Sequence, residues 1–249
     1  MFTLLATFIA SLTTIAGNTS NRRGAVCFTF DDYFGNEWLK ANVLLKKYDA
    51  HATFFVVGDI TEEKAQVMKK LQDFGHTVGL HTKNHRNATE LPQNYDMGKY
   101  VAEQVLSQLE ACKKYGIKVS SFAYPNNRYD ENTNKVLFKY FDYLRAGWGK
   151  DKQPIYIPLD KIQEKMVLPG GGIGKYYKSD INNLKKLLLN AHKKNALIVF
   201  FSHNITPGAS HVHMPTEMLE ELLKYARKLN MNIVGAQELP LLKQNRNNK

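Results

Sequence analysis

The chain has few cysteines, fewer acidic than basic residues, and no long hydrophobic run. Its 249 residues contain two cysteines, Cys27 and Cys112, which excludes a disulfide-rich scaffold. Both cysteines lie within apolar patterns that predict buried thiols, although a single bridge in an oxidising compartment stays open. Hydrophobic residues make up 43% of the chain and aromatic residues 11%, which excludes a disordered chain.

The shortage of acidic residues leaves 34 Lys and Arg against 23 Asp and Glu, a net charge of +11. The sequence has no zinc finger, no RNA-recognition signature and no long basic run. Its lysines instead fall in pairs along the expected helices, as in Lys46-Lys47 and Lys185-Lys186, which is typical of solvated outer faces. We therefore expect no nucleic-acid partner, and salt-dependent binding would be the sign of one.

The longest uncharged apolar stretch runs from Leu4 to Ala16. It is too short for a membrane span of about 20 residues and has the length of a secretory signal. We predict a signal peptide over residues 1–17, a single domain over residues 18–242 and a basic tail over residues 243–249. No Lys or Arg precedes the apolar stretch, so an uncleaved anchor or a buried first helix remains an alternative. The signal predicts a secreted or cell-wall protein with no membrane span after cleavage.

The rest of the chain alternates short apolar runs with amphipathic stretches, and no sequence repeat divides it. Apolar runs such as Thr53–Val57 and Leu197–Phe201 are typical of parallel strands covered by helices on the outside. Seven or eight such units in one modest chain favour a (β/α) barrel over an open doubly wound sheet, which stays as the alternative. The expected strands are Gly24–Phe30, His51–Val57, His76–Leu80, Val119–Ala123, Tyr143–Gly147, Ile155–Ile157, Leu197–Ser202 and Asn232–Val234. The expected helices are Glu37–Tyr48, Glu62–Phe74, Met97–Tyr115, Glu131–Tyr140, Ile181–Lys194 and Glu217–Leu229.

Turn and cap residues mark the boundaries of these elements. Residues placed to act as helix N-caps are Thr61, Asp96, Asp130, Asp180 and Thr216, and Gly75 and Gly116 follow two helices as C-cap glycines. The glycine-rich stretch 170–174 lacks the Lys-Ser/Thr ending of a phosphate-binding loop. We interpret it as a flexible loop that borders the functional cleft.

Polar side chains follow four of the expected strands. They include Asp31-Asp32, the stretch from His81 to His85, and His203. Because function gathers at the carboxyl ends of parallel strands in both candidate architectures, we expect these side chains to converge.

His81 and His85 form a His-x3-His pair, which is weak evidence alone because such pairs are often structural. Two imidazoles and one carboxylate with an open fourth position are a catalytic zinc pattern, and a neighbouring strand end supplies carboxylates. The zinc-protease motif is excluded because Thr82 stands where that motif requires Glu.

The adjacent carboxylates Asp31 and Asp32 point to opposite faces of an extended segment. If Asp32 turns toward a metal, Asp31 can act as a general base; a turn or a helix cap is the alternative. His203 is a candidate general acid or a hydrogen-bonded core histidine, and His211 and His213 are the next candidates for the acid.

These motifs together resemble those of the NodB-type polysaccharide deacetylases, which include chitin and peptidoglycan deacetylases. The resemblance rests on Thr29–Asp32, Gly75–His85, Phe122–Pro125 and Phe201–His203 and covers about Ala25 to Leu239. It implies a distorted (β/α) barrel of about seven strands. It also implies a divalent metal, most often zinc, on Asp32, His81 and His85, with Asp31 as base and His203 as acid. The implied reaction removes acetyl groups from an N-acetylated polysaccharide, such as chitin or a related N-acetylglucosamine polymer, and yields acetate and a free amine.

The chain also departs from the family pattern. Ala123 and Asn126 replace an Arg and a Tyr of the third motif, and we name Arg128 and Arg145 as candidates for the missing charge. The resemblance places Tyr124, Pro125 and Asn126, together with Trp148 and Phe201, at the substrate. Trp148, with Asp151, represents the fourth motif loosely, and Phe201 replaces an expected Leu and narrows the acetyl pocket. A glycan- or wall-binding protein that kept the barrel without turnover is the alternative function.

Overall fold

The computed structural model describes residues 22–244 except 92, 94, 150 and 209–210. The proposed signal peptide and almost all of the basic tail lie outside this range. Seven parallel strands form a closed ring in the order β1, β2, β3, β4, β5, β7 and β8, and β8 pairs again with β1. The strand bounds are β1 Ala25–Phe30, β2 Thr53–Val56, β3 Thr77–Leu80, β4 Ser121–Ala123, β5 Tyr143–Gly147, β7 Met166–Gly172 and β8 Ala196–Ser202. The predicted barrel of about seven strands is therefore confirmed, and the open sheet is excluded.

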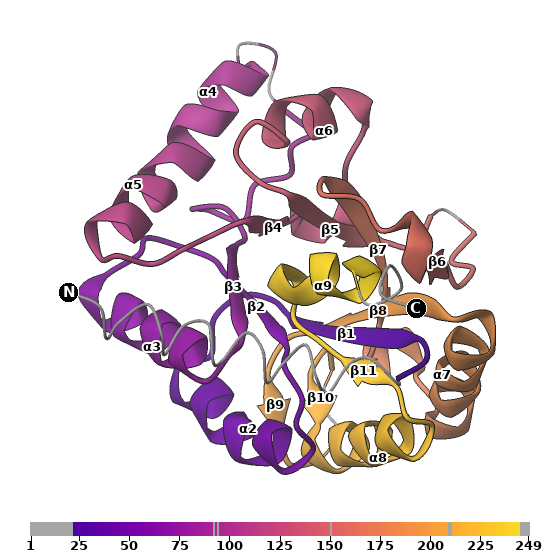
Figure 1. Ribbon diagram of the computed structural model, residues 1–249. Helices are drawn as coiled ribbons and strands as arrows, with labels where there is room; N and C mark the ends of the chain where they lie inside the picture. Colours follow the sequence, from indigo (N-terminus) through magenta and orange to yellow (C-terminus); the bar gives the residue numbers. More distant parts are fainter. Residues whose placement is uncertain (1–21, 92, 94, 150, 209–210, 245–249) are drawn as a thin grey trace.

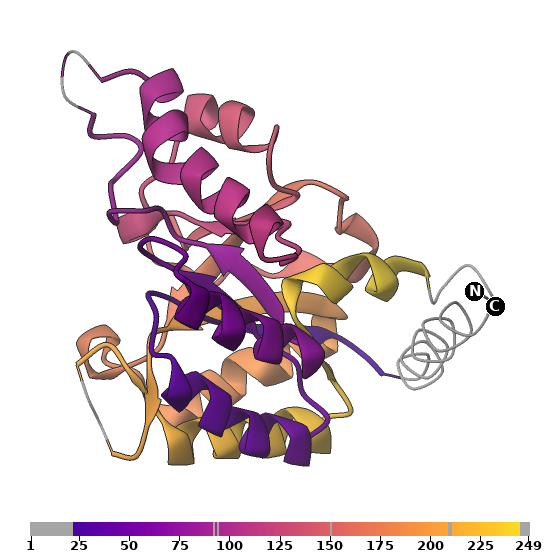
Figure 2. The same ribbon diagram turned by 90° about the vertical axis from the view of Figure 1, so that its left-hand side faces the viewer.

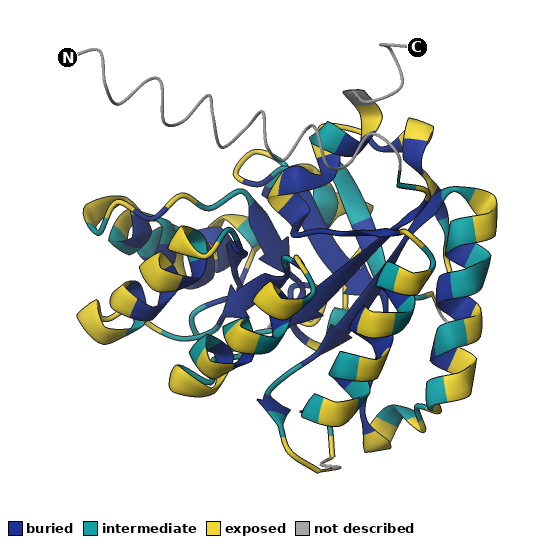
Figure 3. Cartoon of the chain, turned by 60° about the horizontal axis from the view of Figure 1, so that its bottom comes forward, coloured by how far each residue is buried: buried dark blue, intermediate teal, exposed yellow. Residues whose placement is uncertain are grey.

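Helices surround the ring on its outside, with one exception (Figures 1 and 2). Their bounds are α2 Asn36–Lys47, α3 Glu62–Asp73, α4 Met97–Val101, α5 Ser107–Lys114, α6 Glu131–Leu137, α7 Ile181–Lys194, α8 Thr216–Lys228 and α9 Leu239–Gln244. The exception is α9, which lies over the middle of the ring in Figure 1 and contributes Leu239 and Leu242 to the core inside it. Figure 3 shows buried strands inside and helices whose outer faces are exposed, as expected of amphipathic helices on a closed sheet.

Four of the five predicted N-caps are confirmed, because Thr61, Asp96, Asp130 and Asp180 each accept a hydrogen bond from the first turn. Thr216 is instead the first residue of α8, whose cap position is occupied by Pro215. A proline at that position places the helix start without a side-chain hydrogen bond.

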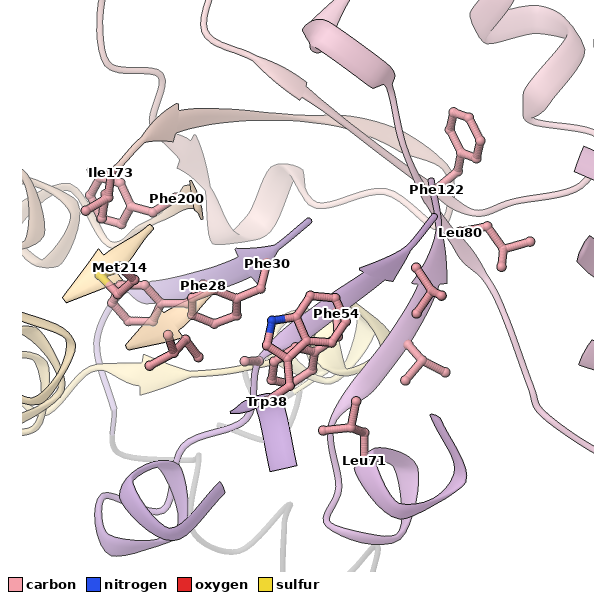
Figure 4. Close-up of a cluster of buried hydrophobic side chains, with 14 of the residues drawn as sticks. Phe28, Phe30, Trp38, Phe54, Leu71, Leu80, Phe122, Ile173, Phe200 and Met214 are labelled. Atoms are coloured by element: carbon pink, nitrogen blue, oxygen red, sulfur yellow. The ribbon is translucent and has the colours of Figure 1, made fainter. Parts of the chain in front are cut away.

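Side chains alternate between the two faces of each strand and form two cores. In β1, Val26, Phe28 and Phe30 belong to the larger core, which packs under the helices, and Figure 4 shows part of it. Ala25 and Cys27 belong to the second core, which fills the inside of the barrel. Cys27 and Cys112 are both buried and free, as predicted.

Two smaller strands flank the ring. The first, β11 (Asn232–Ile233), pairs with the start of β1, while β2 pairs with the end of β1. The other, β6 (Ile157–Pro158), is antiparallel to the start of β8. The run expected at Ile155–Ile157 is thus an added strand and no member of the ring.

The glycine-rich stretch was wrongly predicted to be a loop. Gly170, Gly171 and Gly172 are the last residues of β7, which pairs with β5 on one side and β8 on the other. Aromatic rings occupy the space where their side chains would lie: a Cβ on Gly172 would come 2.5 Å from the ring of Tyr177, and one on Gly171 would meet Trp148. Close packing, which strand propensity does not include, therefore explains the glycines.

The predicted helix Met97–Tyr115 is also interrupted. A π-helical turn, Ala102–Leu106, separates α4 from α5. Gln104, in the π-turn, and Gln108, in α5, are both buried, although their segment was expected to follow ordinary helical periodicity. Single π-turns are frequent beside functional sites.

Candidate functional site

The polar residues at the carboxyl end of the barrel continue the strand alternation. Asp31, His81, Arg145 and His203 all fall on the inward-facing positions of β1, β3, β5 and β8, continued past the strand ends. Closure of the ring therefore brings together residues more than 170 positions apart in the sequence.

Asp32, His81 and His85 form the one group of three or more candidate metal ligands found among the described residues. Their ligand atoms all lie within 4.8 Å of one another. Oδ1 of Asp32 is 3.7 Å from Nε2 of His81 and 3.9 Å from Nε2 of His85. These separations are too long for hydrogen bonds, but ligands at about 2.1 Å from a tetrahedral ion lie about 3.4 Å apart. The donor set and its spacing fit a divalent metal ion after small side-chain adjustments.

The imidazole of His81 is fixed in the orientation that metal binding requires. Its Nδ1 lies 2.8 Å from the carbonyl oxygen of Ala123, so Nδ1–H donates and the lone pair of Nε2 faces Asp32. Burial, followed by the charges of Arg145 and His85, lowers the pKa of His81. The neutral imidazole, which is the form that binds metal, is therefore the stable one.

Backbone strain is concentrated around this group. Of the ten non-glycine residues with positive φ in the described chain, five lie here: Asp32, Thr82, His85, Asn126 and Asn127. Such conformations are costly and persist only where the surrounding structure imposes them. At Asp32, with φ of 77°, the turn ends the strand alternation and directs the carboxylate toward the two histidines.

Two buried glutamines from the interrupted helix hold the loops that carry these ligands. Gln104 accepts from the amide of Asn84 through its side chain and from Lys83 through its carbonyl. Nε2 of Gln108 donates to the carbonyl of Gly58 at 2.7 Å and lies 3.2 Å from that of Thr82. The loops after β2 and β3 are thus tied to one helix.

Asp31 lies against a buried arginine. The guanidinium of Arg145 donates to Oδ2 of Asp31 and to Oδ1 of Asn127, while Oδ1 of Asp31 is buried without a hydrogen-bond partner among the described residues. Arg128, the other candidate, is exposed. Arg145 therefore occupies the place beside Asp31 that Ala123 leaves without a charge.

Aromatic rings complete the surroundings of Arg145. Its guanidinium carbon lies 4.7 Å from the ring centre of Phe201 and 5.8 Å from that of Phe55. Both rings are almost fully buried. They exclude water around the Asp31–Arg145 pair, and their cation–π contacts stabilise the positive charge of the Arg145 guanidinium.

His203 stands on the other side of Asp32. Its Nε2 is 3.8 Å from Oδ2 of Asp32, and its Nδ1 is 3.1 Å from the carbonyl oxygen of Val212. His213 lies behind it, with ring centres 6.4 Å apart, and its Nδ1 accepts from the amide of Asn204. His211 is exposed and farther out. Of the three candidates for the acid, His203 is the one that faces the carboxylate.

The structure separates the five predicted substrate contacts. Tyr124 is fully buried and its hydroxyl donates to Asn134, so its side chain is not available to a substrate. Pro125 is buried as well, whereas Asn126 is exposed with φ of 54°. Asn126 lies inside the short 3-10 turn Pro125–Asn127 that follows β4. The loop after β4 therefore exposes backbone at Asn126, whereas the sequence suggested that the side chain of Tyr124 would contact the substrate.

Trp148, also predicted to contact the substrate, lies apart from the residues on the inner face of the barrel. Its ring packs on Gly171 and Phe200, on the outward face of the strands, because residue 148 follows the outward parity of β5. Asp151 is exposed. Phe201 keeps an inward position against Arg145.

Tyr177 is a site residue that the sequence reasoning missed. Its ring lies on Gly172, 5.3 Å from the ring of Phe201. Burial and then the charge of Asp31 raise its pKa to about 12, so the phenol stays protonated beside the site. The glycines of β7 were the available signal, since a glycine in a strand often marks close approach of another group.

The chain is similar in sequence to known polysaccharide deacetylases. The family model "Polysaccharide deacetylase" matches residues 18–140. Peptidoglycan-N-acetylmuramic acid deacetylase PdaA of Bacillus subtilis is 28% identical over 105 residues, which is 42% of this chain and 36% of PdaA. A peptidoglycan-N-acetylglucosamine deacetylase of Bacillus cereus is 36% identical over 81 residues, 32% of this chain and 28% of that protein. The matches thus span about a third of the length of these relatives.

Solved structures share the fold over most of the chain. Peptidoglycan deacetylase PdaC from Bacillus subtilis superposes with a TM-score of 0.56 at 19% identity, covering 92% of this chain and 95% of that one. A CE4 family pseudoenzyme from Bacillus anthracis gives a TM-score of 0.58 at 18% identity, covering 88% and 66%. The family model, these relatives and the shared seven-stranded barrel together identify the chain as a member of the polysaccharide deacetylase family.

Proposed function

We propose that this protein is a metal-dependent deacetylase of N-acetylated polysaccharide. The observation that carries the proposal is the spacing at the barrel rim, where Asp32, His81 and His85 lie too far apart to bond one another but at the separation of shared ligands. The reaction would hydrolyse the amide C–N bond with water and yield acetate and a free amine.

Asp32, His81 and His85 would hold the ion, with zinc as the first candidate because the donors are two imidazoles and a carboxylate. When bound, such an ion supplies Lewis-acid polarisation and lowers the pKa of water. The carbonyl of Ala123 and the two buried glutamines keep the donors in place.

Asp31 is proposed as the general base. Oδ2 is held by Arg145, which leaves Oδ1 without a partner and free to accept a proton from the attacking water. Arg145 orients the carboxylate for that transfer.

His203 is proposed as the general acid. Its Nδ1–H donates to the carbonyl of Val212, so Nε2 is the atom that gains and releases a proton. After C–N cleavage begins, Nε2–H would protonate the leaving amine. The backbone amide of Asn126, in the exposed turn after β4, is suited to stabilise charge on the acetyl oxygen.

The substrate is proposed to be an N-acetylglucosamine polymer of a cell wall, with peptidoglycan preferred over chitin. Support comes from the activities of similar proteins, which include a peptidoglycan deacetylase of Helicobacter pylori at 29% identity over 125 residues. A secreted or wall location would follow. In the described residues, no helix has the length and apolar character needed to cross a membrane.

The alternative, a glycan-binding protein without turnover, was motivated by the absence of an arginine at Ala123. A pseudoenzyme among the structural relatives keeps that alternative in view. The contact between Arg145 and Asp31 argues for the enzyme, because it restores the charge from another strand.

The test is acetate release from peptidoglycan and from chitin oligomers, together with metal content by mass spectrometry. We expect Asp31→Asn and His203→Gln to keep the metal and to lose activity by about 10²–10⁴-fold. Stoichiometric metal and glycan binding with no acetate from any substrate would favour the alternative, and full activity of Asp31→Asn would refute the assigned base. His192→Gln is the matched control, because this histidine in the last turn of α7 lies outside the proposed machinery.

A further inference from the structure

An exposed aromatic residue stands beside the site on a rigid support. Tyr176 is 63% exposed, more than any other aromatic side chain that the structure describes. Its ring centre lies 5.1 Å from that of Tyr177 and 5.1 Å from that of His211, in edge-to-face geometry. Its amide donates to the carbonyl of His211 at 2.7 Å. An exposed ring that is held at both backbone and side chain is suited to contact a ligand.

A row of packed rings connects Tyr176 with the catalytic centre. Tyr177 contacts Tyr176 on one side and Phe201 on the other, and Phe201 lies on the guanidinium of Arg145. Burial, and after it the charge of Asp31, raises the pKa of Tyr177, as expected of a half-buried phenol near the proposed base. Tyr176 is therefore the outermost member of a row that begins at Asp31.

The support under Tyr176 is built from two loops that cross closely. Gly174 has φ of 146°, and a Cβ there would come within 3.0 Å of the backbone carbon of Val212. The hydroxyl of Ser179 accepts from the amide of Gly174 at 3.2 Å. The ring is thus largely positioned before any ligand arrives, which limits the entropy lost on binding.

A pyranose ring matches this surface in chemistry. It presents an apolar C–H face that packs on an aromatic ring, and a rim of hydroxyls that hydrogen-bond with polar neighbours such as His211. A polysaccharide extends past the sugar that reacts, so the surface next to the site meets a neighbouring sugar.

We propose that Tyr176, supported by Tyr177 and His211, forms a subsite that stacks on a pyranose ring neighbouring the one deacetylated. This inference rests on the proposed function, and it assigns the loop after β7 a role in choosing polymer over single sugars. The stacking favours chains long enough to reach Tyr176 from Asp31.

The test is binding of a chitin tetramer, measured by calorimetry in the Asp31→Asn background so that turnover plays no part. We expect Tyr176→Ala to weaken binding about five- to tenfold and Tyr176→Trp to retain it. In the active protein, Tyr176→Ala should raise KM for the tetramer by the same factor and change kcat less than twofold. Tyr140→Ala, which removes a partly exposed tyrosine at the end of the α6 segment, is the matched control and should behave as the parent.

Two results would overturn the subsite: tetramer affinity of Tyr176→Ala within twofold of the parent, or full retention of affinity by Tyr176→Leu, since leucine is apolar without being aromatic. A different result separates this inference from the proposed function. If Tyr176→Ala weakens tetramer binding but no substrate yields acetate, the subsite stands and the deacetylase assignment fails.

Discussion

The two ends of the barrel use the same residue types at different spacing. At the amino-terminal end, Nδ1 of His51 lies 2.9 Å from Glu238, and Nε2 of His76 lies 3.1 Å from the side chain of Asn42. At the carboxyl-terminal end, the nitrogens of His81 and His85 stand 3.7 and 3.9 Å from Asp32. The first set is satisfied by hydrogen bonds within the protein, whereas the second set leaves its lone pairs directed at a common point.

The cavity that the structure shows does not lie at the same end of the barrel as the candidate metal ligands. A cavity of about 290 Å³ lies at the amino-terminal end, lined in part by Asn42, His51 and Phe74. The convergent ligand atoms lie at the other end of the strands. Unsatisfied, convergent donors and backbone strain therefore locate the candidate site better than the cavity does.

The largest expected effect comes from replacing one histidine at each end of the barrel and comparing the zinc affinities of the two variants. We expect His81→Ala to lower zinc affinity at least 100-fold, because a direct ligand is lost and second-sphere losses alone reach about 10–100-fold. His51→Gln should leave zinc affinity unchanged. Competition titration with a chromogenic chelator measures both, and equal losses in the two variants would show that the spacing has no such meaning.

The next largest effect concerns the buried ion pair. Arg145→Met leaves the carboxylate of Asp31 buried without its partner, which we expect to cost about 3–5 kcal/mol of unfolding free energy. The double variant Asp31→Asn/Arg145→Met should recover most of this loss, because the buried charge is then gone. Urea unfolding measures both, and equal stability of the single and double variants would contradict an electrostatic origin.

A smaller effect is expected at the glycines of β7. Gly172→Ala places a methyl group against the ring of Tyr177, and such overpacking costs about 1–3 kcal/mol. Tyr177→Leu in the same chain should relieve part of the strain. Thermal unfolding of the two variants checks this. Gly149→Ala is the control, because a Cβ there would make only an ordinary contact, 3.6 Å from Oδ1 of Asp151. A Gly172→Ala protein as stable as the parent would show that Tyr177 moves aside freely.

The last effect, similar in size to the previous one between about pH 6.5 and 5, is a pH dependence of the unfolding free energy that arises at the amino-terminal end. Burial, then the charge of His51, lowers the pKa of His76 to about 3, below the usual 6.5. The unfolded chain therefore gains a proton that the folded chain lacks, and stability falls as pH drops from about 6.5 toward 3, by up to about 1.4 kcal/mol per pH unit.

His76→Gln should flatten this part of the stability profile in urea unfolding at pH 7, 6 and 5 with chelator present. The neighbouring His51 acts in the opposite sense. Burial lowers its pKa, but the hydrogen bond and charge of Glu238 outweigh burial and raise it, so its contribution is lost as pH rises. A His76→Gln profile parallel to that of the parent would exclude His76 as the source.

Sequence reasoning could predict those features that depend on local pattern. The apolar runs and strand-end polar residues predicted the barrel, and they predicted that Asp32, His81 and His85 would meet. It failed where tertiary packing decides. The strand β7 was missed because glycines have low strand propensity, although aromatic rings fill the space beside them.

The alternation of side chains between the two faces of β5 would have identified Arg145 as the partner of Asp31 and placed Trp148 on the outer face. Tyr143 and Arg145 share a face of β5, and a charged residue in an otherwise apolar buried strand is a signal for a partner inside the barrel. The same parity turns Trp148 outward, against Gly171 and Phe200. The burial of Tyr124 depends on α6, which supplies Asn134, and no local pattern reports that contact.

Asp31 and Arg145 come from strands on opposite sides of the ring, with β7 and β8 between them by the shorter route. The segment 18–140 carries both aspartates and both metal-facing histidines but ends before Arg145. A nascent or truncated chain of that length would contain the proposed metal ligands but would lack Arg145, the positive charge beside the proposed base. The ability to carry out the proposed reaction would then depend on the last part of the chain, whose strands close the ring.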